Sequence, residues 1–295
     1  MATCICKEHH LKFERALKLS KLAPRSEDTY MERVDTLSMY FNRCLCDLSD
    51  DDILNYFFTC MQTKKHAAGT LRPAKAGVKF FFTFVLNRST EFLKVVNPET
   101  IAKIPEIFSE AEAWRILDNT RLPQHRACMT LMYTCGLRIS EALNMTVDDF
   151  DRRHQQIRIR SGKGQKQRMV PIPTWTLQQL RNYWCIHRNP KWIFPAIHSN
   201  PKVASITTKS MSANAIRDPL KAVVAELDIN ITDARPHTFR HSYATHLLDA
   251  GVNLHTVSRY LGHSNIRSTM IYLHLTRQGH EQALAIIERI MRGEG

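Results

Sequence analysis

The sequence lacks any apolar run approaching the roughly 18 to 20 residues that a membrane-spanning helix needs. It also lacks a bias toward Gly, Ser or Pro, which excludes the low-complexity disordered and fibrous classes. The first residues, MATCICKEHHLKFERALK, carry charges where a secretory signal peptide carries its apolar segment. With 43% hydrophobic and 23% charged residues, the composition is that of a folded protein, which we expect to be cytoplasmic and free of membrane.

The chain has few acidic residues in comparison with its basic residues. The chain has 28 Asp and Glu against 41 Lys and Arg, so its formal net charge is +13. An excess of this size favours a polyanionic partner, and nucleic acid is the leading candidate. At roughly 150 residues per domain, the length of 295 residues predicts two domains.

The eight cysteines are dispersed along a chain too long to need disulfide bonds for its stability, so we expect reduced thiols. Cys4 and Cys6, followed by His9 and His10, could form a metal cluster. However, no second CxxC-type pair follows at zinc-finger spacing. The sequence therefore disfavours a metal there, and we predict neither a metal nor another cofactor.

Residues 26 to about 96 have the periodicity of helices. Ser26 is the predicted cap of a helix whose apolar residues recur at three- and four-residue steps. Asp50–Asp52 precede a second apolar stretch, and acidic residues favour the positive end of a helix. A third helix is expected from about Thr70. The first half is therefore predicted to be a small helical bundle.

A group of basic residues lies between two of these apolar helices, as phosphate contacts would. A merely solvated helix face is the alternative explanation. The candidate DNA-contacting residues are Lys64, Lys65, Arg72, Lys75 and Lys79.

One segment of the second half predicts β-structure. Ile157 and Ile159 alternate with arginines, the letters SGKGQ supply a turn, and MVPI continues the alternation on the return. This pattern predicts a β-hairpin with Lys163 at its tip. Elsewhere in this half we expect helices, including segments that end at Gly251 and Gly262 and one that carries Tyr272.

The second half also collects the residue types that break a phosphodiester bond without a metal. Guanidinium groups stabilise the negative charge of the transition state through paired hydrogen bonds. A lysine on a hairpin tip can protonate the leaving oxygen, and a tyrosine beside cationic groups can act as the nucleophile. A covalent phosphotyrosine would conserve the bond energy and allow rejoining without ATP. The candidates are Arg138, Lys163, His237, Arg240, His263 and Tyr272.

The segments TCGLRISEAL, SGKGQKQRMVPI, HTFRHSYATHLLDAGV and LGHSNIRSTMIYLHL resemble the tyrosine recombinase (phage integrase) family, most closely its Xer-type and integron- or transposon-associated members. The resemblance implies a mainly α fold with a small β-sheet or hairpin. A helical, SAM-like core-binding domain is expected at residues 1–98 and a linker at 99–106. Residues 107–295 are expected to form a mixed α+β catalytic domain whose C-terminal helix contacts a neighbouring subunit.

The resemblance also implies a role for each candidate. Tyr272 would attack the scissile phosphate to give a 3′-phosphotyrosine and a free 5′-hydroxyl, while Arg138 and Arg240 clamp the phosphate. Lys163 would protonate the leaving 5′-oxygen, and His237 would assist proton transfer to and from Tyr272.

Other residues near these motifs also match positions of the family. His263 corresponds to the family's second histidine, and Glu141 resembles a supporting acidic position that orients its neighbours. His241 and His246 match packing positions of the family. His237 and His241 have the i,i+4 spacing of a zinc pair, but no carboxylate ligand lies nearby in sequence, which disfavours a metal there.

The sequence thus predicts a site-specific DNA recombinase that acts on paired sites in double-stranded DNA, as a homotetramer or as a hetero-oligomer with a related recombinase. Its task would be integration, excision, resolution or transposition of DNA. The alternatives are a catalytically silent DNA-binding or architectural protein of the same fold and a metal-dependent nuclease. A type IB topoisomerase uses similar chemistry but relaxes DNA without preferring a site.

Overall fold

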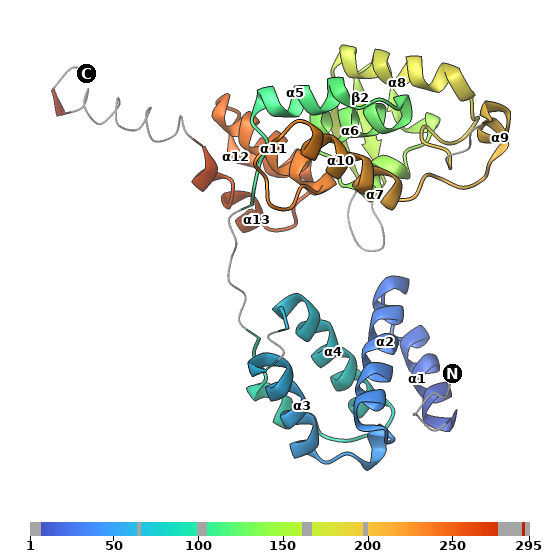
Figure 1. The fold of residues 1–295 in the computed structure, drawn as a ribbon, viewed down its shortest axis with the longest axis vertical. Coiled ribbons are helices and arrows are strands. Elements are labelled where there is room, and N and C mark those ends of the chain that lie inside the picture. The colour runs from blue at the N-terminus through green and yellow to red at the C-terminus, as the bar shows by residue number, and fades with distance from the viewer. Residues whose placement is uncertain are drawn as a thin grey trace. The chain divides into compact units, whose positions relative to one another are not determined.

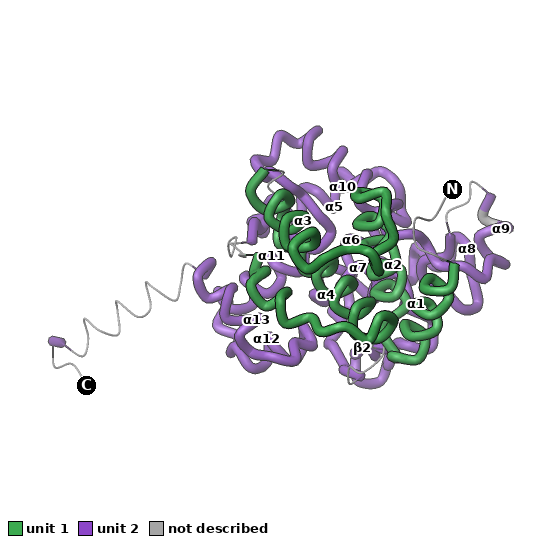
Figure 2. The backbone as a smooth tube through the Cα atoms, turned by 90° about the horizontal axis from the view of Figure 1, so that it is seen from below, with its two compact units in different colours: residues 1–103 green, residues 104–295 purple. Residues whose placement is uncertain are grey.

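The computed structural model describes residues 7–63, 66–98, 105–160, 167–196, 200–276 and 291–292. The chain divides into two compact units, residues 1–103 and 104–295 (Figure 2). Helices dominate both units, and the second also contains a small three-stranded sheet (Figure 1). The predicted fold class, mainly α with a small β-sheet, is confirmed. No helix of the described segments is long and apolar enough to cross a membrane.

The first unit is a helical bundle. Its core is rich in aromatic side chains: Phe13, Phe57, Phe81 and Phe82 are completely buried. The edge of the Phe13 ring packs on Phe81 with ring centroids 5.2 Å apart, a geometry that aromatic pairs favour. Its elements are α1 (Lys7–Leu19), α2 (Pro24–Phe41), η1 (Leu45–Asp47), α3 (Asp50–Gln62), α4 (Ala68–Phe84) and η2 (Glu91–Val95).

Two helix starts in this unit differ from the sequence prediction. Helix α1 precedes the region assigned to helices from sequence. Helix α2 begins at Pro24 with Ala23 as its N-cap, so Ser26 is not the cap. Pro24 suits the first helical position because its fixed φ matches the helix and its missing N–H costs no hydrogen bond there. The acidic start predicted for the next helix is present, with Ser49 and Asp52 forming a capping box.

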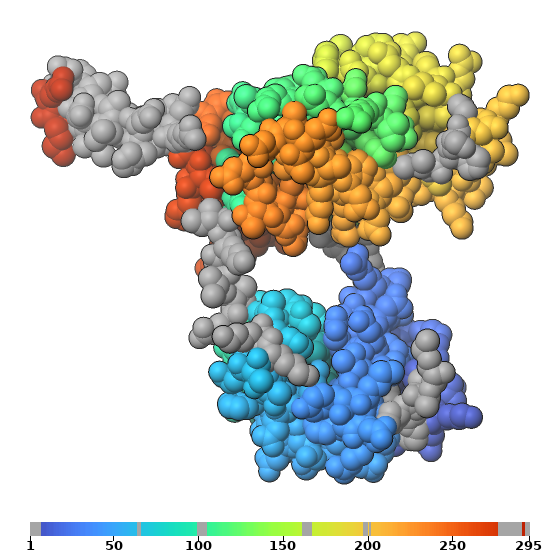
Figure 3. All heavy atoms as spheres, viewed as in Figure 1, coloured from blue at the N-terminus to red at the C-terminus, as the bar shows by residue number. Residues whose placement is uncertain are grey.

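The second unit is built around helix α6, which packs between α5, α8, α10 and α11. Atoms of α5 and α10 form part of one face of this unit (Figure 3). Its helices and helical turns are α5 (Glu110–Asn119), α6 (Pro123–Cys135), α7 (Ile139–Leu143), η3 (Val147–Asp149), α8 (Thr174–His187), α9 (Pro201–Ile206), α10 (Asn214–Glu226), α11 (Pro236–Asp249), α12 (Leu254–Leu261), α13 (Arg267–Met270) and η4 (Leu273–Leu275).

The sheet of the second unit is antiparallel in the order β1 (Phe150–Asp151), β2 (Gln156–Ile159), β3 (Arg168–Pro171). Ile157 pairs with Val170, and both side chains are completely buried. The alternation in the sequence therefore predicted the inward face of the hairpin correctly. Lys163, expected at the hairpin tip, lies outside the described residues.

Candidate active site

The site begins at the junction between helices α6 and α7. Gly136 ends α6 with a left-handed φ of 62°, and Arg138 is the N-cap of α7. The Arg138 backbone N–H donates to Glu141 Oε2 at 2.8 Å, and its Nη1 donates to Glu141 Oε1, also at 2.8 Å. Glu141 thus holds both the backbone and the guanidinium of Arg138.

Replacement of Gly136 by Ala is expected to lower the free energy of unfolding by about 3 kcal/mol, from left-handed backbone strain and overpacking together. A Cβ there would lie 2.3 Å from Cδ1 of Tyr243. Gly251 is a matched control: its φ is also positive, at 86°, but nothing lies within 4 Å of an added Cβ. Gly251→Ala should therefore cost only the backbone strain, about 1 kcal/mol.

The measurement is urea unfolding followed by tryptophan fluorescence, which reports on the second unit alone because every tryptophan of the chain lies there. The fluorophores are Trp114, Trp175, Trp184 and Trp192. An equal loss of stability in the two alanine variants would contradict the close packing of Tyr243 on Gly136.

Two further arginines converge on Glu141. Arg168 makes a two-pronged ion pair, with Nη1 and Nη2 each 2.9 Å from one oxygen of the Glu141 carboxylate. Arg240 is only 1% exposed and lies 3.7 Å from Glu141 Oε2. Its Nη1 and Nη2 donate to the carbonyls of Gly136 and Leu261, at 2.8 and 2.6 Å. Both guanidiniums are therefore held rigidly in place.

This arginine cluster (Arg138, Arg168, Arg240) carries more positive charge than its one carboxylate neutralises. Burial raises the pKa of Glu141, but the hydrogen bonds and charge of Arg168 outweigh it and bring the pKa to about 2. Burial, with the charge of Arg138, lowers the pKa of Arg240 to about 10. Three guanidiniums and one carboxylate give this group of side chains a net charge of +2. Such a cluster favours a bound anion such as a phosphate.

Tyr272 lies beside this cluster in a shell of histidines. Its side chain is 2% exposed, and its Oη lies 2.9 Å from Nδ1 of His241. The ring of His263 stacks on the Tyr272 ring at 6.4 Å and 18°, while its Nδ1 lies 2.7 Å from Thr269 Oγ1. The ring of His237 meets His241 edge to face at 4.6 Å. The tyrosine is therefore enclosed by imidazoles rather than exposed on a surface.

The protonation states suit a proton transfer from the tyrosine. Desolvation, and then the charges around them, lower the pKa values of His241 and His263 to about 4. His237 is more exposed, yet the same causes bring its pKa to about 4 as well. Burial raises the pKa of Tyr272, against the opposing charges of Arg240 and Arg138. At neutral pH the phenol is therefore protonated and His241 is neutral, and in the tautomer whose Nδ1 carries no proton His241 can accept the proton of the phenol.

These histidines make the stability of the second unit depend on pH. Between about pH 4 and 6.5 the unfolded chain, whose imidazoles have ordinary pKa values near 6.5, binds more protons than the folded one. The urea midpoint from tryptophan fluorescence is thus expected to fall as the pH is lowered through this window. His263→Gln should weaken the dependence, and the exposed His255→Gln should not. An unchanged slope in His263→Gln would contradict the expectation.

The structure brings together most of the residues singled out from sequence, namely Arg138, Glu141, His237, Arg240, His263 and Tyr272. Lys163 lies outside the described residues. Among the described residues, no group of three metal-ligand side chains includes His237 or His241.

Two functional candidates were missed by the sequence analysis. His241, assigned to packing, contacts the Tyr272 hydroxyl directly through its Nδ1. The i,i+4 spacing of His237 and His241 places the two rings on one face of α11, where they are in contact. Arg168 was not singled out, but the hairpin alternation places it on the same face as the buried Val170. His246 does pack, against the hydroxyl of Tyr133 at 3.0 Å.

The basic residues proposed for DNA contact in the first unit differ in how far their side chains are exposed to solvent. Arg72 and Lys79 on α4 are exposed. Lys75 is half-buried, and its Nζ donates to the carbonyl of Val96 at 2.6 Å. Lys64 and Lys65 lie outside the described residues. The exposed face of α4 is therefore available for contact through Arg72 and Lys79.

Comparison with known proteins gives a consistent result for both units. Residues 103–278 match the phage integrase family, and residues 11–91 match the N-terminal SAM-like domain of phage integrases. The tyrosine recombinase XerD of Lacticaseibacillus casei is 30% identical over 291 residues, covering 92% of each chain. XerC of Chlorobaculum tepidum is 31% identical over 229 residues, covering 68% of this chain and 67% of that protein.

Solved structures share the fold at low sequence identity. The Tn1549 transposon integrase, in complex with circular intermediate DNA, superposes with a TM-score of 0.71 at 19% identity, covering 96% of this chain and 99% of that one. XerH bound to its difH substrate superposes with a TM-score of 0.70 at 16% identity, covering 96% and 97%. By its family match, its relatives and its fold, this chain belongs to the phage integrase family of tyrosine recombinases.

Proposed function

We propose that this chain is a site-specific recombinase that cleaves and rejoins double-stranded DNA through a covalent phosphotyrosine at Tyr272. The observation that carries the proposal is the hydrogen bond between the Tyr272 phenol and His241, beside an arginine cluster with a net charge of +2. A nucleophile, a proton acceptor and an anion site are thus next to one another. Family membership favours recombination over the binding-only and metal-nuclease alternatives.

The arrangement suggests how the reaction proceeds. The arginine cluster binds the non-bridging oxygens of the scissile phosphate and stabilises their growing negative charge. Tyr272 Oη forms a bond to phosphorus as its proton passes to Nδ1 of His241, and the bond from phosphorus to the 5′-oxygen breaks. That oxygen takes a proton, for which Lys163 is the proposed donor. A 5′-hydroxyl of the partner strand then reverses these steps, so neither ATP nor a metal is consumed.

The proposed substrate is duplex DNA with paired recombination sites. The related Tn1549 integrase and XerH structures contain DNA. The net charge of +13 and the exposed Arg72 and Lys79 of α4 are suited to phosphate contacts. We assign core binding to residues 1–98, a linker to 99–106 and catalysis to 107–295.

Strand exchange between two sites requires several active subunits, and we propose a tetramer on DNA. The C-terminal segment is the proposed subunit contact. Of its residues 280–295, the structure describes only Met291 and Arg292. Its sequence, HEQALAIIERIMRGEG, is amphipathic, as expected of a helix that docks on a neighbour.

The proposal is tested with nicked duplex DNA that traps the covalent intermediate, incubated with the chain in EDTA. We expect a slow-migrating protein–DNA band on a denaturing gel, and mass spectrometry should locate the nucleotide on Tyr272. Cleavage that appears only after magnesium is added would support a metal-dependent nuclease instead. Tight binding to every tested site without an adduct would support a binding protein of the same fold.

A further inference from the structure

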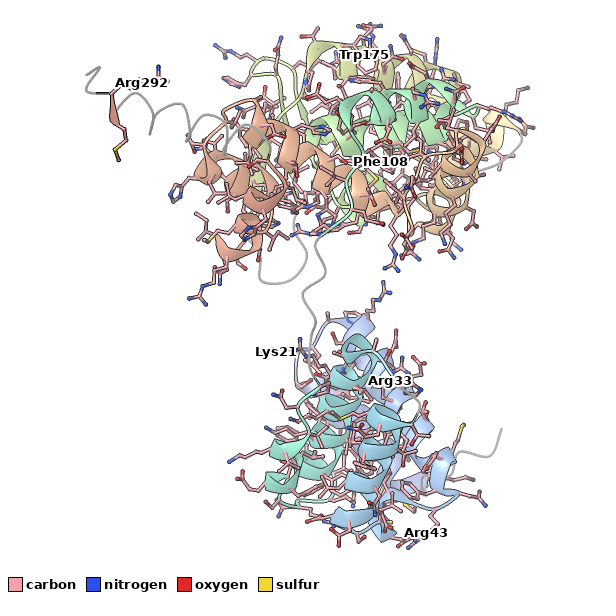
Figure 4. All side chains as sticks on the ribbon, turned by 60° about the vertical axis from the view of Figure 1, so that its left-hand side comes forward. Lys21, Arg33, Arg43, Phe108, Trp175 and Arg292 are labelled. Atoms are coloured by element: carbon pink, nitrogen blue, oxygen red, sulfur yellow. The ribbon has the colours of Figure 1, made fainter. Side chains whose placement is uncertain are left out.

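A second cluster of reactive side chains lies in the first unit, away from any residue assigned to recombination. His9 on α1 meets Cys44 and Cys46, which flank Leu45 at the start of η1. One donor atom from each of the three residues lies within 4.8 Å of the other two. Arg43, labelled in Figure 4, immediately precedes this cysteine pair. Two segments about 35 residues apart thus place three metal-binding side chains together.

We propose that His9, Cys44 and Cys46 bind a thiophilic divalent cation, with Zn²⁺ as the expected ion. Two thiolates and one imidazole are a donor set that zinc prefers over harder cations. The ion would join α1 to the turn between α2 and α3. This proposal does not depend on the recombinase function.

The distances are close to those that a zinc ion needs. Zinc bonds of about 2.3 Å to sulfur and 2.0 to 2.1 Å to nitrogen place the donor atoms of a tetrahedral site about 3.5 to 3.8 Å apart. The Sγ atoms of Cys44 and Cys46 lie 2.8 Å apart, so about 1 Å of separation is required. Cys46 is exposed, and a χ1 adjustment of its side chain can supply this movement.

The charges of the cluster also favour a cation. Asp47 Oδ1 lies 3.6 Å from Cys46 Sγ, so a carboxylate stands beside two thiols. A divalent cation would displace the thiol protons and balance the negative charges of the two thiolates and Asp47.

The surroundings orient the histidine as well. The His9 ring packs edge to face on Phe81, with centroids 6.4 Å apart and planes at 84°. Phe81 is completely buried in the core of the bundle, so it gives the imidazole a fixed support. Helix α1 buries only Phe13 and Leu17 among its described residues. A metal bond from His9 would therefore strengthen a helix that has few core contacts of its own.

This pairing lacks the usual zinc signal in the sequence, which is a second CxxC-type pair at zinc-finger spacing. The two cysteines form a CxC pair about 35 residues after His9. Only the turn after α2 brings them close to His9 in space. Cys4 and Cys6 lie outside the described residues, and the proposal does not rest on them.

The test uses the full-length chain, purified without an affinity tag under reducing conditions, and measures bound zinc by inductively coupled plasma mass spectrometry. We expect about one equivalent per chain. The double variant Cys44→Ser/Cys46→Ser should lose it, whereas Cys185→Ser, at an exposed cysteine of the second unit, should keep it. Zinc retained at wild-type level by a folded double variant would overturn the proposal.

Cobalt provides a readout that does not depend on the variants. Titration of the metal-free wild-type chain with Co²⁺ should produce the thiolate-to-cobalt charge-transfer band and the intense visible bands of tetrahedral coordination. Circular dichroism checks that the metal-free chain is folded. Absence of these bands, or a Cys44–Cys46 disulfide found by mass spectrometry in the reduced preparation, would overturn the proposal.

Discussion

Replacement of Tyr272 by Phe is expected to abolish covalent capture of nicked DNA while leaving the affinity for the same duplex unchanged. The phenylalanine ring fills the same buried space, but it lacks the oxygen that bonds to phosphorus. Loss of a covalent nucleophile lowers rates by about a thousandfold or more, because the remaining groups cannot form the intermediate. The adduct on a denaturing gel and a filter-binding titration measure the two quantities separately.

Tyr133 offers a matched control for this substitution. It is also a buried tyrosine whose hydroxyl meets a histidine, with 3.0 Å between its Oη and Nδ1 of His246. Tyr133→Phe removes a comparable hydrogen bond outside the arginine cluster, so it should leave adduct formation within a few-fold of wild type. An undiminished adduct in Tyr272→Phe, or an equal loss in both variants, would contradict the assignment of the nucleophile.

Replacement of Glu141 by Gln is expected to destabilise the second unit by about 3 to 5 kcal/mol, the usual cost of removing one partner from a buried ion pair. The shape of the side chain is retained, but Arg168 and Arg240, which are 9% and 1% exposed, lose their counter-charge. The measurement is urea unfolding at neutral pH, followed by tryptophan fluorescence. Adduct formation should fall as well, because the amide no longer fixes the guanidinium of Arg138 through a charged bond.

The control for this charge removal is Glu226→Gln. Glu226 pairs with Arg121 through Oε1 at 2.7 Å, but the two side chains are 54% and 80% exposed. Solvent screens such a pair, so its loss should change the stability by no more than about 0.5 kcal/mol. A Glu141→Gln variant as stable as Glu226→Gln would show that the arginine cluster does not need its carboxylate.

The sequence by itself determined the local structure and the main chemistry. Ser109 and Glu112 form the capping box that starts α5, because that pair satisfies backbone N–H groups within one turn. The alternation around Ile157 specified the hairpin, because neighbouring strand residues face opposite sides. The motifs that contain Arg138, Arg240 and Tyr272 indicated the family before any contact was known.

Only the tertiary structure decided which side chains meet. His241 contacts Tyr272 across 31 residues, and Arg168 contacts Glu141 across 27. His9 meets the cysteines of the turn between α2 and α3 at a similar separation. Helical and strand periodicity reports on neighbours within a few positions and carries no information about such distant pairs. The packing of α11 against η4, which follows Tyr272, therefore selected the partner of the tyrosine. The packing of α1 against α2 and α4 brought together the residues of the proposed metal site.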